Sequence, residues 1–130
     1  LPKKTGAAGL FSNVPDILKV IDVLQGCYGG ESDYLSSHSV KSLLKNQIPQ
    51  LATTSLGMEF KEPRFMGAMG NQLETLGKTG FTGCHWQWAP ERALGLVFLS
   101  NYPWPRRLKS AQPINAMRSQ LGDCAMDCSI

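Results

Sequence analysis

Three consecutive residues, Lys78, Thr79 and Gly80, combine a cation, a hydroxyl group and a position without a side chain. On an extended strand, Lys78 and Gly80 point to one face and Thr79 to the other. Gly80 also lets a ligand or another backbone approach closely. An anionic substrate along such a strand would be held by charge, by the hydroxyl group and by main-chain N–H groups. The triplet therefore indicates a binding wall, and three ordinary strand residues are the alternative.

The residues around this triplet predict an antiparallel sheet. Strands are expected at about 72–79, 83–89 and 94–100, because each stretch is rich in apolar or aromatic residues and is bounded by turn residues. The tight 80–83 link joins the first pair, and the 89–93 turn joins the second. The strand at 94–100 is apolar on both faces, which is typical of a strand inside a sheet.

Helices are expected on either side of this sheet. Apolar residues at helical spacing predict a helix over about 13–25 that begins at the N-cap Ser12. A second helix, capped by Ser36 or Ser37, stops before Pro49. A last helix over about 111–121 presents an apolar face, and that face is made of Ile114, Met117 and Leu121.

Between the second helix and the sheet, Thr53 to Phe60 is expected to form a strand with Leu56, Met58 and Phe60 on one side. Residues 61–70 are rich in Pro, Gly and Met and are expected to be a connection over a site. These patterns together predict one α+β domain over residues 1–130. Its antiparallel sheet has at least three C-terminal strands packed with helices, and Trp86 and Trp88 share a core-facing side.

The amino-acid composition of the chain limits the classes of function that we expect for it. At 130 residues and 42% hydrophobic content, the chain can bury one modest core. Its net charge of +3 is spread along the chain apart from a basic cluster at 106–109, so no nucleic-acid partner is expected. No apolar run approaches the roughly 20 residues that span a bilayer. The sequence does not indicate the cellular compartment of the protein.

Neither a metal nor a cofactor is expected. A zinc site needs about four ligands, usually in tight pairs of cysteines with histidines nearby. Only two histidines are present, His38 and His85. Small buried or surface thiols explain the four cysteines, whose disulfide state stays open: Cys27, Cys84, Cys124 and Cys128.

The region around Lys78 resembles the third signature motif of the serine β-lactamase and penicillin-binding-protein family, especially its class C and esterase-like branch. In that family a Lys-Thr-Gly strand is followed by a Pro-Glu turn, an apolar strand ending in Asn, and a Tyr-Pro-x-Pro segment. The matching residues here are Pro90-Glu91, Asn101 and Tyr102-Pro103-Trp104-Pro105. Gly9-Leu10-Phe11-Ser12 resembles the family's Gly-Leu-x-Ser segment, so the likeness runs from about Gly6 to about Leu121.

The resemblance implies a partial β-lactamase/transpeptidase-like fold and roles for five residues. Lys78 would supply a positive field, and the amide of Phe81 would be one of two oxyanion-hole donors. Thr79, Gly80 and Arg107 would bind a small acyl substrate, which is a β-lactam, an ester or a peptide. Trp104 stands where the family has Asn, and this difference favours a more apolar ligand.

The nucleophile is the missing part. Ser42 and Lys45 fit the family's Ser-x-x-Lys motif, but the motif lies too close to Lys78 in the sequence, and an exposed polar helix face explains both residues. Tyr28 and Tyr34 lack the Tyr-x-Asn setting of the second motif. Because family members are much longer, we expect the C-terminal portion of a serine hydrolase or acyltransferase.

Its partner would be an N-terminal companion chain, or a second copy pairing through strand 94–100. The alternatives are a non-catalytic binding or interaction remnant that uses the same sheet edge, and an unrelated α+β domain.

Overall fold

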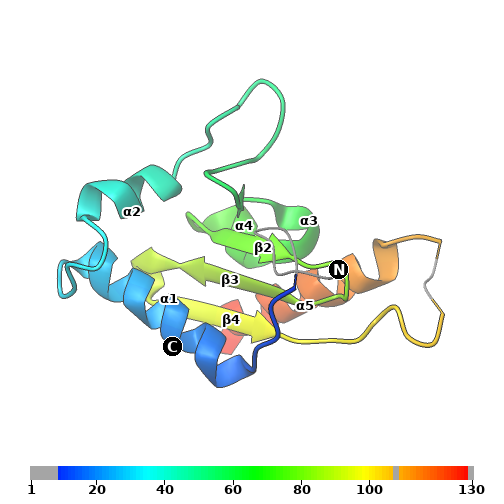
Figure 1. Ribbon diagram of the computed structural model, residues 1–130. Coiled ribbons are helices and arrows are strands. Elements are labelled where there is room, and N and C mark those ends of the chain that lie inside the picture. Colours follow the sequence, from blue (N-terminus) through cyan, green and yellow to red (C-terminus); the bar gives the residue numbers. More distant parts are fainter. Residues whose placement is uncertain (1–8, 107–108, 129–130) are drawn as a thin grey trace.

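A four-stranded antiparallel sheet with helices on both faces forms the protein (Figure 1). The computed structural model describes residues 9–106 and 109–128. The strands are in sequence order across the sheet, β1-β2-β3-β4. The elements are α1 (Val14–Gly29), α2 (Ser37–Leu43), β1 (Glu59–Phe60), α3 (Pro63–Met66), α4 (Ala68–Gln72), β2 (Leu76–Thr79), β3 (His85–Ala89), the 3-10 helix η1 (Pro90–Arg92), β4 (Leu94–Phe98) and α5 (Gln112–Cys128). The α+β class and the antiparallel C-terminal strands are thus confirmed.

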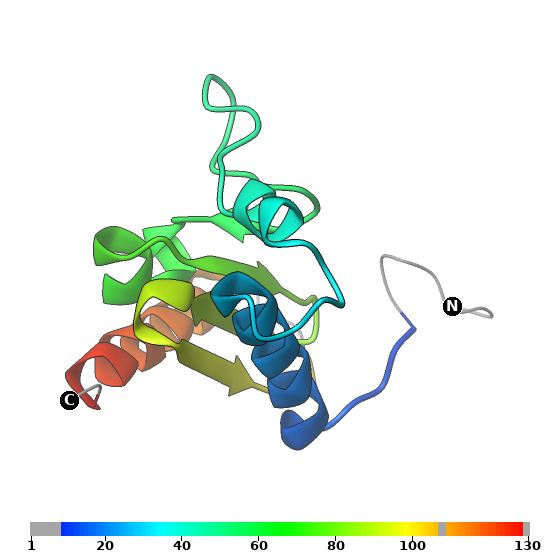
Figure 2. The same cartoon turned by 90° about the vertical axis from the view of Figure 1, so that its left-hand side faces the viewer.

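Helix α1 covers one face of the sheet, and Figure 2 shows α5 on the opposite side. Helix α1 begins one residue later than expected, because Asn13 and not Ser12 is its N-cap. The side chain of Asn13 accepts a hydrogen bond from the amide of Asp16. The helix also continues past Gly26 to a left-handed C-cap at Gly30. Its last turn is held by packing, since Cys27 is fully buried there.

The core under α1 contains the two tryptophans that were expected there. Trp88 is fully buried, and its indole N–H donates to Gln25 Oε1 at 2.8 Å. Trp86 is half-buried against the same cluster, which also includes Ile21 and Leu24 of α1. Helix α2 packs beside α1 and begins at the expected cap, Ser36, whose hydroxyl accepts from the amide of Ser39.

The segment between α2 and the sheet differs from the prediction. Only Glu59 and Phe60 form a strand, and Leu56 is exposed instead of facing the core with Phe60. Residues 61–70 are not an open connection, because they contain α3 and most of α4. A buried group including Phe65 explains this, since burial against α5 stabilises helices too short to persist alone.

The sheet strands are shorter than the sequence patterns suggested. Strand β2 begins at Leu76, because the preceding Thr75 hydroxyl donates to the carbonyl of Met69 and ends the α4 connection. Strand β3 begins at His85, after Gly83 turns the chain with a φ of +91°. Strand β4 ends at Phe98.

Helix α5 is rotated relative to the expected face. The buried residues are Ile114, Arg118 and Gly122, whereas Met117 is 48% exposed. Gly122 sets this orientation, because a side chain there would overlap the carbonyl of Met66. Helix α5 also extends to Cys128 instead of ending near residue 121.

Candidate functional site

The two adjacent residues Lys78 and Thr79 point to opposite faces of β2. Lys78 lies opposite Trp86 and Thr79 opposite His85 in the β2–β3 register. The ammonium group of Lys78 forms an ion pair with Glu59 of β1, at 3.3 Å, and half of its side chain is exposed. Glu59 therefore offsets part of the positive field that the sequence assigns to Lys78.

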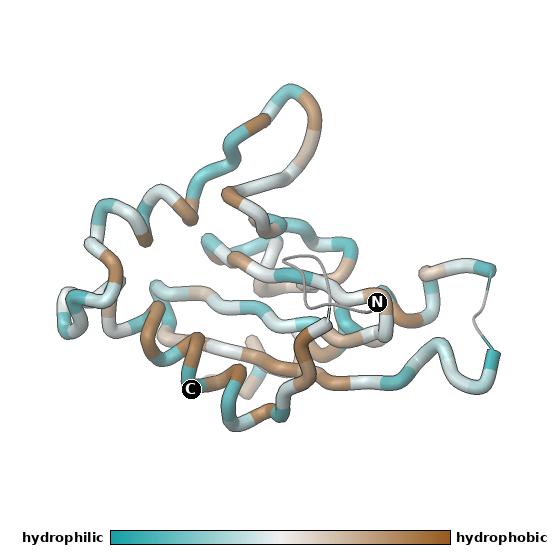
Figure 3. The backbone as a smooth tube through the Cα atoms, in the orientation of Figure 1, coloured by the Kyte–Doolittle hydropathy of each residue, from teal (hydrophilic) through white to brown (hydrophobic). Residues whose placement is uncertain are grey.

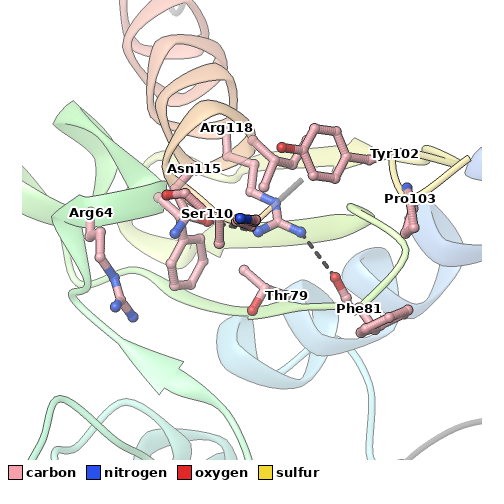
Figure 4. Close-up of a pocket in the computed structure, with 13 residues that line it drawn as sticks. Arg64, Thr79, Phe81, Tyr102, Pro103, Ser110, Asn115 and Arg118 are labelled. Carbon is pink, nitrogen blue, oxygen red and sulfur yellow. Dashed lines mark hydrogen bonds between the residues drawn. The ribbon is translucent and has the colours of Figure 1, made fainter. Parts of the chain in front are cut away.

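A cleft of about 360 Å³ opens where β2 ends, and Figure 4 shows the side chains around it. Thr79, Gly80 and Phe81 form one wall, and Lys78 is not among the lining residues. The remaining walls come from α3, from the loop after β4 and from the start of α5. They include Arg64, Phe65, Tyr102, Lys109, Asn115 and Arg118.

The backbone after Gly80 is a tight turn that closes on itself. The amide of Gly80 donates to the carbonyl of Cys84 at 2.7 Å, and the amide of Gly83 donates to the carbonyl of Gly80 at 3.1 Å. Gly83 must lack a side chain here, because a Cβ atom would collide with Tyr102 and its φ is positive. The amide of Tyr102 donates to the carbonyl of Thr82, which ties the next loop to the turn.

Arg118 of α5 holds the same turn from the other side. Its side chain donates to the carbonyls of Gly80, Gly83 and Cys84, all at 3.1 Å, and to Asn115 Oδ1 at 2.8 Å. The residue is 4% exposed. Burial lowers the pKa of Arg118, and the nearby Cys84 and Glu59 act in the opposite direction. Arg118 was not predicted, although its spacing from Ile114 and Gly122 would have placed it on a buried face.

The cleft has a cationic lining. Arg64, Lys109 and Arg118 line it, and none of its described lining residues is acidic. The hydroxyl group of Tyr102 is buried and has no hydrogen-bond partner among the described residues. A negatively charged ligand with hydrogen-bond acceptors would complement this surface.

Behind the cleft lies an unusual pair of buried polar side chains on β3. His85 is 2% exposed and Gln87 is fully buried, and within the described ranges their side-chain nitrogen and oxygen atoms have no partners. His85 packs between the rings of Phe65 and Phe98. Burial, and after it the positive charge of Arg118, lowers the pKa of His85 to about 4. The imidazole is therefore neutral at neutral pH.

The other chemically suggestive residues lie elsewhere. The hydroxyl group of Ser42 donates to the carbonyl of His38 within α2, and Ser42 does not line the cleft. Arg107 falls outside the described residues. All four cysteines are free thiols: Cys27, Cys84, Cys124 and Cys128.

Residues 9–106 and 109–128 include no group of three or more His, Cys, Asp or Glu side chains that could hold a metal ion. No helix among them has the length and apolar character needed to cross a membrane. Comparisons with protein-family models, with curated proteins and with solved structures found no match for this chain.

Proposed function

We propose that this chain supplies one wall of the acyl-binding cleft of a serine hydrolase or acyltransferase of the β-lactamase and penicillin-binding-protein type. The nucleophile would come from a segment outside this sequence. The observation that carries the proposal is that Thr79, Gly80 and Phe81 line one cleft at the end of β2. Two residues of the Lys-Thr-Gly motif, Thr79 and Gly80, would then face the substrate as the family resemblance implies, whereas Lys78 does not line this cleft.

The chemistry assigned to this wall is stabilisation of an oxyanion. Attack of a serine on an acyl carbonyl creates a negative oxygen, which two N–H donors would bind, and the amide of Phe81 is one of them. Removing such a donor typically costs about 3–4 kcal/mol of transition-state stabilisation. Thr79 and Gly80 would hold the substrate alongside.

The cationic lining indicates which charge the substrate would carry. Lys78 does not line the cleft, so the positive charge that faces it comes from Lys109, from Arg118 and from Arg64, whose charge is partly offset by Glu62 at 3.9 Å. An acyl substrate with a negative charge fits this lining better than a neutral ester. Phe81 is 70% exposed at the rim and would contact an apolar group of the same substrate.

The companion segment would dock at the free edge of β4. No described strand pairs with that edge, and the strand is half-buried over its whole length. Figure 3 shows hydrophobic residues along both β4 and the neighbouring α1. An apolar edge without a protecting charge or proline favours pairing with another strand. That strand would come from the companion segment or from a second copy.

A non-catalytic binding module is the second candidate. The observation in its favour is that the one Ser-x-x-Lys motif lies away from the cleft: Ser42 is on α2, Lys45 follows that helix, and neither lines the cleft. The cationic cleft would then bind an acidic peptide or a small anion without turnover.

Activity measurements distinguish the two candidates. The test uses a chromogenic cephalosporin and p-nitrophenyl butyrate, with this chain alone and with a polypeptide from the same gene that carries a Ser-x-x-Lys helix. We expect no turnover by the chain alone and turnover by the combination. No turnover by a combination shown to form a complex would support the binding module. Turnover by the chain alone would refute both candidates.

A matched pair of variants tests the role of Phe81. Phe81→Pro removes the amide donor, whereas Phe81→Ala keeps the amide and removes the ring. In the active combination, Phe81→Pro should lower kcat by about 10²–10³-fold, and Phe81→Ala should retain most of it. Equal losses in the two variants would contradict a role for the amide.

A further inference from the structure

We propose that Arg118 is the positioning residue of the cleft, because its guanidinium group holds the Gly80–Cys84 turn and thereby fixes the Thr79–Phe81 wall. Only the catalytic use of this wall rests on the proposed function. The contacts that define it exist without any substrate.

The shape of the guanidinium group matches this turn. Its Nε donates to the carbonyl of Gly83, and its Nη2 donates to the carbonyls of Gly80 and Cys84. Three carbonyl groups of one five-residue turn thus converge on one side chain. A planar fork with fixed donor directions can satisfy them together, whereas a lysine ammonium group is a single point with a different geometry.

These bonds complete the turn's own hydrogen bonds. The carbonyl of Gly80 already accepts from the amide of Gly83, and the carbonyl of Cys84 already accepts from the amide of Gly80. A carbonyl oxygen has two lone pairs, and Arg118 takes the second in each case. Phe81 and Thr82 are the residues between these fixed points, so their backbone has little freedom to move.

Burying an arginine to hold a turn costs free energy, which argues that Arg118 does more than pack against the turn. Arg118 is 4% exposed, and its hydrogen-bond partners among the described residues are neutral. Burying a cation costs free energy that an apolar side chain would avoid, and the net lowering of its pKa shows that the nearby Glu59 offsets this cost only in part. Figure 4 shows its guanidinium group reaching from α5 towards the turn, beside Thr79 and Phe81. The charge is therefore delivered to the cleft wall itself.

A second attachment makes the effect of removing Arg118 local. The amide of Tyr102 donates to the carbonyl of Thr82 and does not depend on Arg118. The sheet pairing of β2 with β3 also remains in place. Loss of the guanidinium group should therefore loosen the turn without unfolding the domain.

Amide hydrogen exchange of the substrate-free chain, followed by NMR, tests this role. Arg118→Lys keeps the positive charge and removes the fork. We expect the amides of Gly80 and Gly83 to exchange about tenfold faster or more, and the amide resonance of Phe81 to shift. Exchange in α1 should be unchanged. Arg64→Lys is the matched control, because Arg64 also lines the cleft but makes no bond to the turn in the described structure.

The exchange rates at Gly80 and Gly83 decide whether Arg118 has this role. Unchanged exchange at Gly80 and Gly83 in Arg118→Lys, or equal acceleration throughout the chain, would overturn the proposal. If Arg118→Lys fails to fold, Asn115→Ala replaces it, since it removes only the acceptor of Nη1 and should give a smaller acceleration at the same two amides. No acceleration in that variant would likewise overturn it.

Turnover measurements remain independent of this result. Accelerated exchange with no hydrolase activity in any combination would leave Arg118 as the brace of a binding cleft and would refute only the hydrolase. In an active combination, Arg118→Lys should lower kcat about tenfold with little change in KM, because the turn would position a donor that acts in the transition state.

Discussion

Acidification should destabilise this protein through one side chain, His85. The imidazole is buried between two aromatic rings, close to the cation of Arg118, and its nitrogen atoms have no partner within the described residues. Burial and that charge lower its pKa in the folded state to about 4, whereas a histidine in an unfolded chain has a pKa near 6.5. The unfolded state therefore binds the proton more readily.

The sign and size of the effect follow from this difference. Since the unfolded state binds more protons between about pH 4 and pH 6.5, the stability contributed by neutral His85 is complete above that window and is lost as the pH falls through it. Linkage between the two pKa values gives a loss of about 2 kcal/mol between pH 7.5 and pH 5. For a domain of this size that is a large share of the free energy of unfolding.

Urea denaturation at several pH values between 7.5 and 5 measures the loss. The carboxylates begin to titrate at the lower end, so the wild-type chain is compared with His85→Phe, which keeps an aromatic ring in place and removes the titrating group. The difference between their free energies of unfolding should change by about 2 kcal/mol across this range. His38→Gln serves as the control, because His38 is exposed on α2.

Parallel pH profiles of the wild type and His85→Phe would refute the reasoning. That result would mean that His85 gains a proton in the folded state as easily as in the unfolded one. Either a partner for its nitrogen atoms or access of water to the buried face of β3 would then have to exist.

Three further predictions concern packing, association and the Ser-x-x-Lys motif. Gly122→Ala should lower the free energy of unfolding by about 2 kcal/mol or more, because the new methyl group overlaps the carbonyl of Met66, whereas Gly29→Ala in α1 should be tolerated; equal urea midpoints would contradict this. The chain should associate through β4 at about 50 µM in light scattering, and Leu99→Lys beside that edge should weaken association; a monodisperse wild-type monomer would count against the open edge. Ser42→Ala should leave turnover of an active combination unchanged, since this hydroxyl group is bonded within α2, and a loss of turnover would reopen its catalytic role.

Local patterns were sufficient for the C-terminal sheet. Apolar residues and turn residues alternate over short distances there, and each strand pairs with the next one along the chain. The expected positions of β2, β3 and β4 were therefore right to within a few residues. The prediction for Thr53 to Phe60 was wrong for all but the last two residues, because the chain turns back on itself there and Thr54 pairs with Glu59.

The sequence by itself determined that Thr79, Gly80 and Phe81 would follow one another at the end of a strand, because strand and turn preferences act between neighbouring residues. Only the tertiary structure decided which cationic side chain lies beside these three residues. Lys78 is drawn to Glu59, and Arg118, more than thirty residues away in sequence, takes the place behind the turn. No local sequence pattern predicts that Arg118 lies beside this turn in place of Lys78. Its position depends on how closely Gly122 lets α5 approach the sheet and on the angle at which α5 then lies.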